Sequence, residues 1–266
     1  MPASNSLLRD FASRTLVIIP AHNEAACVGD VVTRLRQFGF EHIRVVDNAS
    51  TDTSGQVARE AGAEVLFHPQ RGYGLACWIG GVKVPQNIDW LLYCNADASD
   101  DFEAYREFAR IAPENDLILG ARTYLEDRQN LTAPQRFGNW LAPFLIRLFW
   151  GRRFADLGPQ RAIRVSAYER LCLRDRGFGW TVEMQVRAVE EGLRIAEIPA
   201  RCFPRPAGKS KISGNFRGSL FAGVVILQTI GSLAWRRFCS PKSPGASCAS
   251  RKSKGMGNIL PRDPLC

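Results

Sequence analysis

Five short apolar runs constrain the fold most strongly. They read TLVIIP (15–20), IRVVD (43–47), EVLF (64–67), DWLLYCN (89–95) and DLILG (116–120), with segments long enough for a helix and a turn between them. Strand-length apolar runs that alternate with helical segments are typical of βαβ units, which build a mostly parallel sheet with flanking helices. The sequence therefore predicts an α/β fold.

Polar residues follow four of these runs. PAHNE comes after the first run, DNASTD after the second, NADASDD after the fourth and GAR after the fifth. Ligands of parallel sheets bind outside the carboxyl ends of the strands, which lie together at one edge. We therefore expect a single site there.

The acidic stretch after the fourth run indicates a metal. Mg²⁺ and Mn²⁺ prefer oxygen ligands, and Mg²⁺ is commonly held by one or two carboxylates together with substrate phosphates. Asp97, assisted by Asn95 or Asp100, is the candidate ligand for a metal that bridges to a nucleotide diphosphate. The alternative for Asp100 and Asp101 is that they cap the helix that follows.

Two other stretches are candidates for nucleotide contacts. Asp47 ends the second run, where a carboxylate can accept hydrogen bonds from a nucleobase or ribose, although NASTD behind it also fits a turn and helix cap. Arg71, Gly72 and Gly74 open a helix whose backbone N–H groups suit a phosphate or base.

Length and composition predict one main domain. The chain has 266 residues, 45% of them hydrophobic. We divide it into an N-terminal extension (1–14), a domain (15–217), an apolar helix (218–237) and a disordered basic tail (238–266) rich in Ser, Pro, Gly and Lys. No continuous apolar stretch precedes the first run, so no signal peptide is predicted and we expect a cytoplasmic protein.

Two segments indicate contact with a membrane. Residues 134–154 (PQRFGNWLAPFLIRLFWGRRF) combine aromatic bulk with flanking arginines, which is typical of an amphipathic helix in a membrane interface, although a core helix can look similar. Residues 218–235 carry no charge, and buried, interfacial and spanning interpretations are all open. We expect peripheral association with the membrane surface.

The distribution of charge indicates an anionic partner for the second half of the chain. The net charge is −6 over residues 1–133 and +9 over residues 134–217. The positive charge lies with apolar aromatic helices, which argues against a nucleic-acid partner. No GxGxxG follows the first run, which argues against a dinucleotide-dependent dehydrogenase.

Nine segments, taken in order, resemble a known family. They are VIIPAHNEA, VVDNAST, RGYGLA, NADASDD, LILGAR, RFGN, DLGPQRAIR, GWTVEMQ and GKSKISG. This order is similar to family 2 glycosyltransferases, particularly the dolichol-phosphate mannosyltransferase-like and glucosyltransferase-like branch, over residues 15 to 235. The resemblance implies a glycosyltransferase A-type (Rossmann-like) fold, a nucleotide-sugar donor and a polyprenyl phosphate acceptor at the cytoplasmic membrane face.

The resemblance also implies roles for individual residues. It implies that Asp97 and Asn95 bind the metal, and that Asp97, Asp156 and Arg161 take part in catalysis. It implies that Arg122 and Arg136 bind the acceptor phosphate. The nucleotide sugar is assigned to Pro20, Ala21, Asn23, Glu24, Asp47, Gly72 and Asn95, and to a closing loop with Lys209, Ser210 and Lys211.

Two positions depart from the family pattern. Asn95 stands where the acidic motif usually begins with Asp, and Ser99 stands where the mannosyltransferases tend to have Gln. An amide oxygen can coordinate a metal but brings no charge, so we expect weaker binding of Mg²⁺ or Mn²⁺.

The mechanism implied by the resemblance is an inverting displacement. A phosphate monoester, with a second pKa of about 6, is a nucleophile at neutral pH and needs no strong base. A hydroxyl acceptor would need a carboxylate base, for which Asp156 and Glu183 are candidates. The leading hypothesis is hexose transfer to a polyprenyl phosphate. The alternatives are transfer to a soluble or glycan hydroxyl and a catalytically weak nucleotide-sugar-binding protein.

Overall fold

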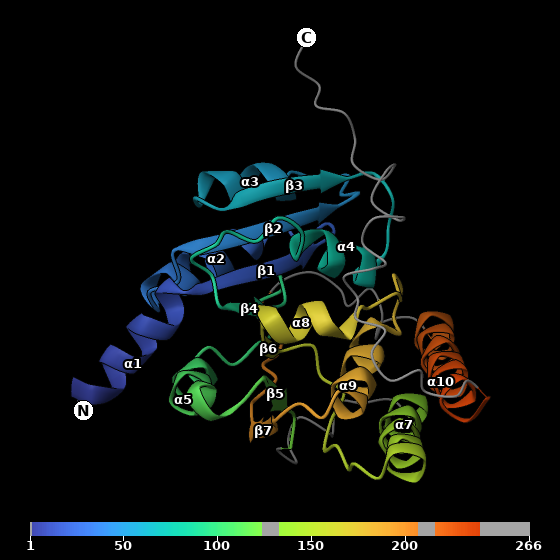
Figure 1. The fold of residues 1–266 in the computed structure, drawn as a ribbon. Coiled ribbons are helices and arrows are strands. Elements are labelled where there is room, and N and C mark those ends of the chain that lie inside the picture. The colour runs from blue at the N-terminus through green and yellow to red at the C-terminus, as the bar shows by residue number, and fades with distance from the viewer. Residues whose placement is uncertain (1, 124–132, 207–215, 240–266) are drawn as a thin grey trace.

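A seven-stranded sheet with helices on both faces forms the molecule (Figure 1). The computed structural model describes residues 2–123, 133–206 and 216–239. The strands are β1 (Thr15–Ala21), β2 (His42–Asn48), β3 (Glu64–His68), β4 (Trp90–Tyr93), β5 (Leu117–Ala121), β6 (Arg161–Arg164) and β7 (Ile195–Pro199). The helices are α1 (Pro2–Ser13), α2 (Val28–Gln37), α3 (Ser54–Glu60), α4 (Tyr73–Gly80), α5 (Ala104–Ile111), η1 (Ala112–Glu114), α7 (Ala133–Trp150), α8 (Val165–Leu171), α9 (Trp180–Glu190) and α10 (Phe216–Cys239).

The sheet is mostly parallel, as predicted. Its strand order is β3-β2-β1-β4-β6-β5-β7, and among these described strands β6 alone runs antiparallel to its two neighbours. All five predicted strands are present as β1 to β5, and their polar carboxyl ends lie at one edge. The α/β prediction is therefore confirmed, whereas β6 and β7 were not predicted.

Alternating side chains of the strands build one core on each face of the sheet. In β1, Val17 and Ile19 face a cluster shared with α2 and α5, whereas Leu16 and Ile18 face a cluster shared with α4 and α9. Helix α1 joins the first cluster through buried Leu8, Phe11 and Ala12. Most of the segment set apart as an N-terminal extension thus packs against the domain.

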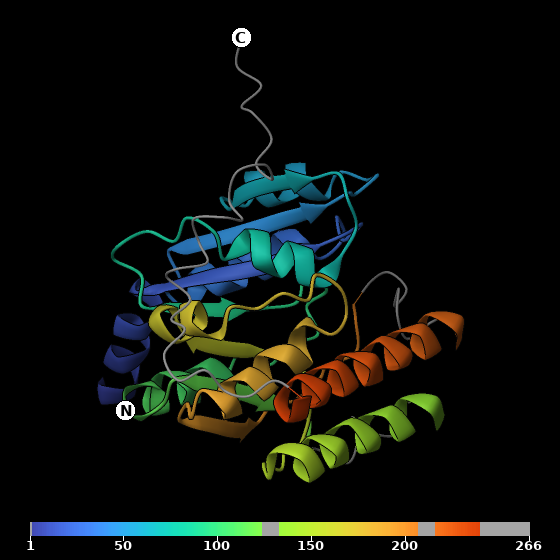
Figure 2. The ribbon, with the colours of Figure 1, turned by 45° about the vertical axis from the view of Figure 1, so that its right-hand side comes forward.

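Helices α7 and α10 lie side by side beyond the sheet (Figure 2). They cover most of the two segments predicted to contact a membrane. On α10, Ile230, Leu233 and Ala234 are buried. Apolar side chains on both helices are exposed, namely Phe144, Leu148, Val224, Leu227, Trp235 and Phe238. Within the three described ranges, no helix has the length and apolar character that crossing a membrane requires.

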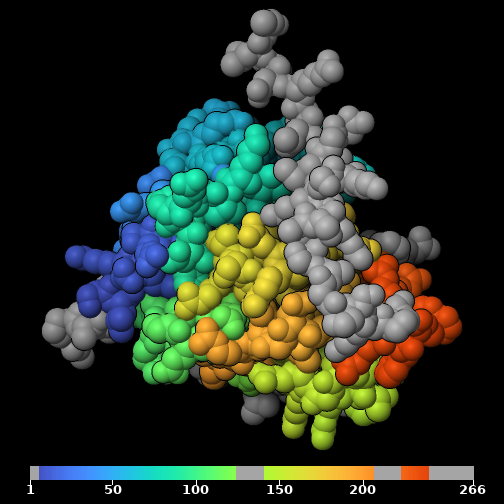
Figure 3. Space-filling view, in the orientation of Figure 1, coloured from blue at the N-terminus to red at the C-terminus, as the bar shows by residue number. Residues whose placement is uncertain are grey.

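The space-filling view, in the orientation of Figure 1, shows α7 and α10 at one end of the molecule, remote from α1 (Figure 3). We call the exposed apolar side chains of these two adjacent helices the α7/α10 face. The predicted tail lies outside the described residues from position 240 onwards.

Candidate active site

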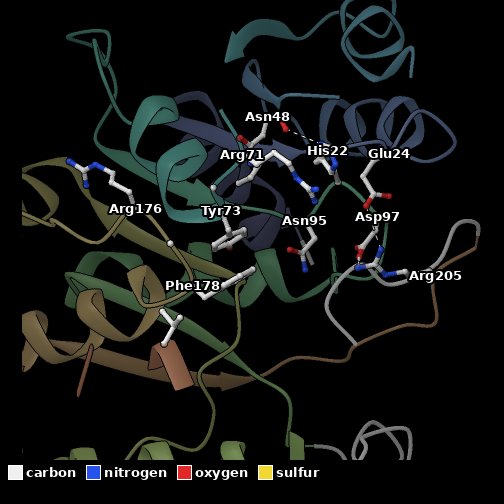
Figure 4. A pocket seen from close by; sticks show the side chains of 15 residues that line it. His22, Glu24, Asn48, Arg71, Tyr73, Asn95, Asp97, Arg176, Phe178 and Arg205 are labelled. Carbon is white, nitrogen blue, oxygen red and sulfur yellow. Dashed lines mark hydrogen bonds and ion pairs between the residues drawn. The ribbon is translucent and has the colours of Figure 1, made fainter. Parts of the chain in front are cut away.

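A pocket of about 650 Å³ lies at the carboxyl edge of the sheet (Figure 4). The carboxyl ends of β1 and β2 and the loops after β1 and β4 form one side of it, and the start of α4 forms another. Residues 176–178 with Val225 of α10 complete the wall, and Arg205 reaches in from the segment after β7. Six of the predicted site residues line this pocket: Pro20, Glu24, Arg71, Gly72, Asn95 and Asp97.

Asp97 is held in a tight turn after β4. Ala98 has a φ of +58°, which turns the chain back so that Ser99 donates to Asp97 Oδ1 from both its N–H (3.0 Å) and its hydroxyl (2.6 Å). The other carboxylate oxygen, Oδ2, lies 2.6 Å from Arg205 Nη2. Asp97 is therefore fixed by the loop on one side and bound to a cation on the other.

Asp100 shapes this loop from beneath. Its carboxylate accepts hydrogen bonds from the backbone N–H of Asn95 (2.7 Å) and from Asn95 Nδ2 (2.9 Å). Burial raises the pKa of Asp100 to about 6 despite these bonds. Asp100 therefore does not cap α5, which begins at Ala104, whereas Asp101 Oδ1 accepts the backbone N–H of Glu103 at 3.1 Å directly before that helix.

The donor set in this loop fits a weakly held divalent metal. Asp97 supplies one carboxylate, and the amide of Asn95 supplies a neutral oxygen beside it. Over the residues that the structure describes, no group of three or more His, Cys, Asp or Glu side chains could hold a metal ion. One carboxylate and one amide suit Mg²⁺ or Mn²⁺ when substrate phosphates and water provide the remaining ligands. A metal at Asp97 Oδ2 would replace Arg205.

Sequence reasoning missed Arg205. It lies just upstream of the quoted GKSKISG segment, and 29% of its side chain is exposed. Besides Asp97, it approaches Glu24 Oε1 at 3.4 Å. Arg205 therefore links the loop after β1 to the loop after β4.

The predicted nucleotide residues fall into two groups. Pro20 and Glu24 line the pocket, whereas Ala21 lies in the core. Asn23 Oδ1 accepts from the Thr51 backbone N–H at 2.7 Å, and Asp47 shapes its own turn in a similar way. Ala21, Asn23 and Asp47 thus support the loops after β1 and β2.

Asn48 was not predicted as a site residue, although it follows Asp47 directly. It lines the pocket and is 8% exposed. Among the described atoms, its Oδ1 finds no hydrogen-bond partner despite being buried. Its backbone carbonyl accepts from Nδ1 of His22, a second pocket residue, at 2.9 Å.

The start of α4 is less open than the sequence predicts. The backbone N–H groups of Gly74 and Leu75 donate to the carbonyls of Gly177 (3.1 Å) and Arg176 (2.8 Å). Part of the helix terminus expected to bind phosphate is thus capped by another segment. Arg71 extends into the pocket (Figure 4), and within the described part of the chain it forms no ion pair.

Asp156 and Arg161 do not line the pocket. Asp156 is bound by Arg122 through Nε (2.7 Å), Nη2 (2.9 Å) and the backbone N–H (3.1 Å). Arg161 is fully buried and donates to backbone carbonyls, including that of Thr181 at 2.9 Å. Glu183 accepts from the backbone N–H groups of residues 174 and 175. Both candidate bases therefore serve contacts within the fold.

The remaining predictions fall outside what the structure describes. Lys209, Ser210 and Lys211 lie outside the described residues. Arg136 lies in the first part of α7, where the structure describes the backbone but not the side chains.

Comparison with known proteins identifies the family. The family model described as glycosyl transferase family 2 matches residues 16–172. An uncharacterized glycosyltransferase of Mycobacterium tuberculosis is 32% identical over 209 residues, which cover 77% of this chain and 93% of the relative. An undecaprenyl-phosphate mannosyltransferase of Micrococcus luteus is 28% identical over 224 residues, which cover 79% and 92%.

Solved structures share the fold at low sequence identity. Mannosyl-3-phosphoglycerate synthase from Rubrobacter xylanophilus aligns with a TM-score of 0.69 at 17% identity, covering 93% of this chain and 82% of that one. Glucosyl-3-phosphoglycerate synthase from M. tuberculosis, in complex with Mn²⁺, UDP-glucose and phosphoglyceric acid, aligns with a TM-score of 0.61 at 18% identity, covering 89% and 84%. The chain, with its glycosyltransferase A-type fold, therefore belongs to glycosyltransferase family 2 and is a glycosyltransferase.

Proposed function

We propose that this enzyme transfers a hexose, with inversion, from a nucleotide-diphosphate sugar to a polyprenyl phosphate. The observation that carries the proposal is the make-up of the pocket. One end holds Asp97 and the cationic Arg71 and Arg205, whereas Phe178 and Val225 provide an apolar wall. A phosphorylated lipid needs both kinds of surface in one site.

The donor occupies the polar end. Pro20, Glu24 and Asn48 lie where the nucleoside binds, and Asp47 supports their loops. We assign the diphosphate to Arg71 and Arg205, together with the predicted closing loop at Lys209, Ser210 and Lys211. The relative bound to Mn²⁺ and UDP-glucose supports a nucleotide sugar as donor.

Asp97 and Asn95 hold a divalent metal when it binds, and the metal supplies positive charge beside the leaving diphosphate. Arg205, once released from Asp97, adds charge that is already positioned for the same group. No further base is required, because a phosphate acceptor is itself the nucleophile. In agreement with a reaction that needs no base, the carboxylates of Glu24 and Asp97, which line the pocket, both face Arg205.

The acceptor enters from the side of α10. Val225 lines the pocket, and its neighbour Val224 is exposed on the α7/α10 face. We propose that this face lies on the cytoplasmic surface of a membrane, which makes the enzyme peripheral. The relative named as an undecaprenyl-phosphate mannosyltransferase supports a lipid acceptor. Arg136 is a candidate for its phosphate, whereas Arg122 would first have to leave Asp156.

A transfer assay tests the proposal. Radiolabelled UDP- and GDP-hexoses are incubated with polyprenyl phosphate in one reaction and with phosphoglyceric acid in another, and label is measured in the lipid and aqueous phases. We expect label in lipid, and about a 100-fold loss for Asp97→Asn, with Asp30→Asn on the exposed side of α2 as the control. Label only in the aqueous acceptor, or normal turnover of Asp97→Asn with Mn²⁺, would contradict the proposal.

A further inference from the structure

Residues 173–179, which we call the strap, connect α8 to α9 and contact both the pocket and α10. Arg176, Gly177 and Phe178 of the strap line the pocket (Figure 4). Asp175, in the same turn, faces Thr229 of α10. One short segment therefore joins the donor pocket to the helix that carries much of the α7/α10 face.

On the pocket side, the strap sets the position of the first turn of α4. Its carbonyls accept the N–H groups of Gly74 and Leu75, as described above. A Cβ on Gly74 would lie 2.6 Å from the Gly177 carbonyl oxygen, so the two backbones are in close contact. Gly72 and Tyr73, which line the pocket, precede this junction directly. A shift of the strap therefore moves the wall of the pocket.

On the α10 side, the contact runs through one carboxylate. Asp175 Oδ1 accepts the Gly177 N–H at 2.7 Å, and Asp175 Oδ2 lies 3.2 Å from Thr229 Oγ1. The single hydroxyl proton of Thr229 is also within reach of the Val225 carbonyl at 2.9 Å. A Cβ on Gly179 would overlap Thr229 Oγ1, so α10 and the strap are in close contact at this position.

The base of the strap is fixed to α9. Glu183 is 3% exposed, and its Oε2 accepts the backbone N–H groups of Arg174 (2.9 Å) and Asp175 (2.7 Å). A buried carboxylate that accepts two N–H groups forms strong, charge-assisted bonds. Movement of α10 is thus transmitted to the turn at residues 175–178 rather than to the whole segment.

We infer that the strap couples the α7/α10 face to the donor pocket, with Thr229 and Asp175 as positioning residues. When α10 lies on a lipid bilayer, the Thr229 hydroxyl holds the turn at Asp175 in place. Through this turn, it keeps the pocket wall in the conformation that binds the nucleotide. This inference rests on the proposed function, because it takes a nucleotide and a bilayer as the two ligands. Coupling between two binding sites is reciprocal, so the nucleotide also strengthens binding to the bilayer.

The test measures binding rather than turnover. Affinities for UDP and for GDP are measured by titration calorimetry on the full chain, with and without phosphatidylcholine–phosphatidylglycerol vesicles. We expect vesicles to tighten binding of the preferred nucleotide by about 5-fold or more. Thr229→Val, which keeps the shape and removes the hydroxyl, should lose this gain, and Thr229→Ser should retain it. Ser232→Ala is the matched control, because Ser232 is exposed and, among the described residues, its hydroxyl bonds to the carbonyl of Thr229 alone.

The outcomes separate the inference from the proposed function. An unchanged gain in Thr229→Val would overturn the coupling. So would a wild-type protein that floats with vesicles and binds nucleotide equally well without them, and both results would leave the proposed function intact. Wild-type protein that binds neither nucleotide would refute the proposed donor, and the inference with it.

Discussion

The buried pair of Arg122 and Asp156 should contribute strongly to stability, and removing the arginine tests this. The side chain of Asp156 is 8% exposed and that of Arg122 is 32% exposed. Burial by itself would raise the pKa of Asp156, but the Arg122 guanidinium outweighs it and holds that pKa below its ordinary value. Arg122→Ala would remove both guanidinium donors and the compensating charge, and would leave the buried carboxylate with backbone hydrogen bonds from residues 122 and 157.

The expected loss follows from this geometry. Removing one partner of a buried ion pair typically costs about 3–5 kcal/mol. Because Arg122 is partly exposed, water can reach the vacated position, and we expect about 3 kcal/mol, at the lower end of that range. In a domain of this size, such a loss lowers the melting temperature by about 6–12 °C. Replacing both partners, as in Arg122→Met with Asp156→Leu, should recover much of the stability, because no charge is then left buried.

Urea unfolding followed by circular dichroism at pH 7 provides the measurement. Arg106→Ala is the control, since Arg106 pairs with Glu103 on an exposed helix surface and its loss should cost less than about 1 kcal/mol. The reasoning would be refuted if Arg122→Ala unfolded like the control while its KM for polyprenyl phosphate rose sharply. That result would return Arg122 to the acceptor site predicted from the sequence.

Three further predictions concern other parts of the chain. Hydrogen bonding from Arg194 lowers the pKa of Asp116 from 3.8 to about 2. The ionised Asp116 therefore stabilises the fold fully above pH 3.8, and this stabilisation is lost as the pH falls through about 2. In Asp116→Asn, the urea concentration at the midpoint of unfolding should therefore fall less steeply as the pH is lowered over this range. Gly74→Ala places a Cβ against the Gly177 carbonyl and should cost about 1–3 kcal/mol and weaken nucleotide binding, so an unchanged midpoint and affinity would argue against close packing there. Truncation after Cys239 should leave vesicle flotation largely unchanged, and its complete loss would assign membrane attachment to the tail.

The sequence predicted β1, β2, β4 and β5, whose apolar runs are buried, and also β3, whose run is only half-buried at the edge of the sheet. It did not predict β6, because the run RAIR begins and ends with arginine and reads as polar. Arg161 can nevertheless occupy a strand in the core, because backbone carbonyls such as that of Thr181 satisfy its guanidinium and Trp180 lies beneath it. That environment is created by tertiary packing, which the local pattern of residues does not contain.

The polar side of the pocket was predictable for a related reason. Parallel strands place their following loops together, so Pro20, Glu24, Asn95 and Asp97 could be assigned to one edge. The opposite wall comes from residues 176–178 and 225, which reach the pocket through the packing of α9 and α10, and Arg205 enters from the segment after β7. Sequence also shows which residues carry charge but not how they pair, which is why the pairing of Arg122 with Asp156 was missed.

Pairing within the chain also changes the meaning of its uneven charge. The basic second half indicated an external anion, yet Arg205 pairs with Asp97, and Arg194 pairs with Asp116, both in the acidic first half. At Asp97 this has a consequence for binding order. A free carboxylate there would repel an incoming diphosphate, whereas Arg205 neutralises it. A divalent metal in its place would bring one positive charge more. A metal held by Asp97 and Asn95 would therefore make the site more positive, and Arg205, no longer paired with Asp97, would be available to bind the same diphosphate.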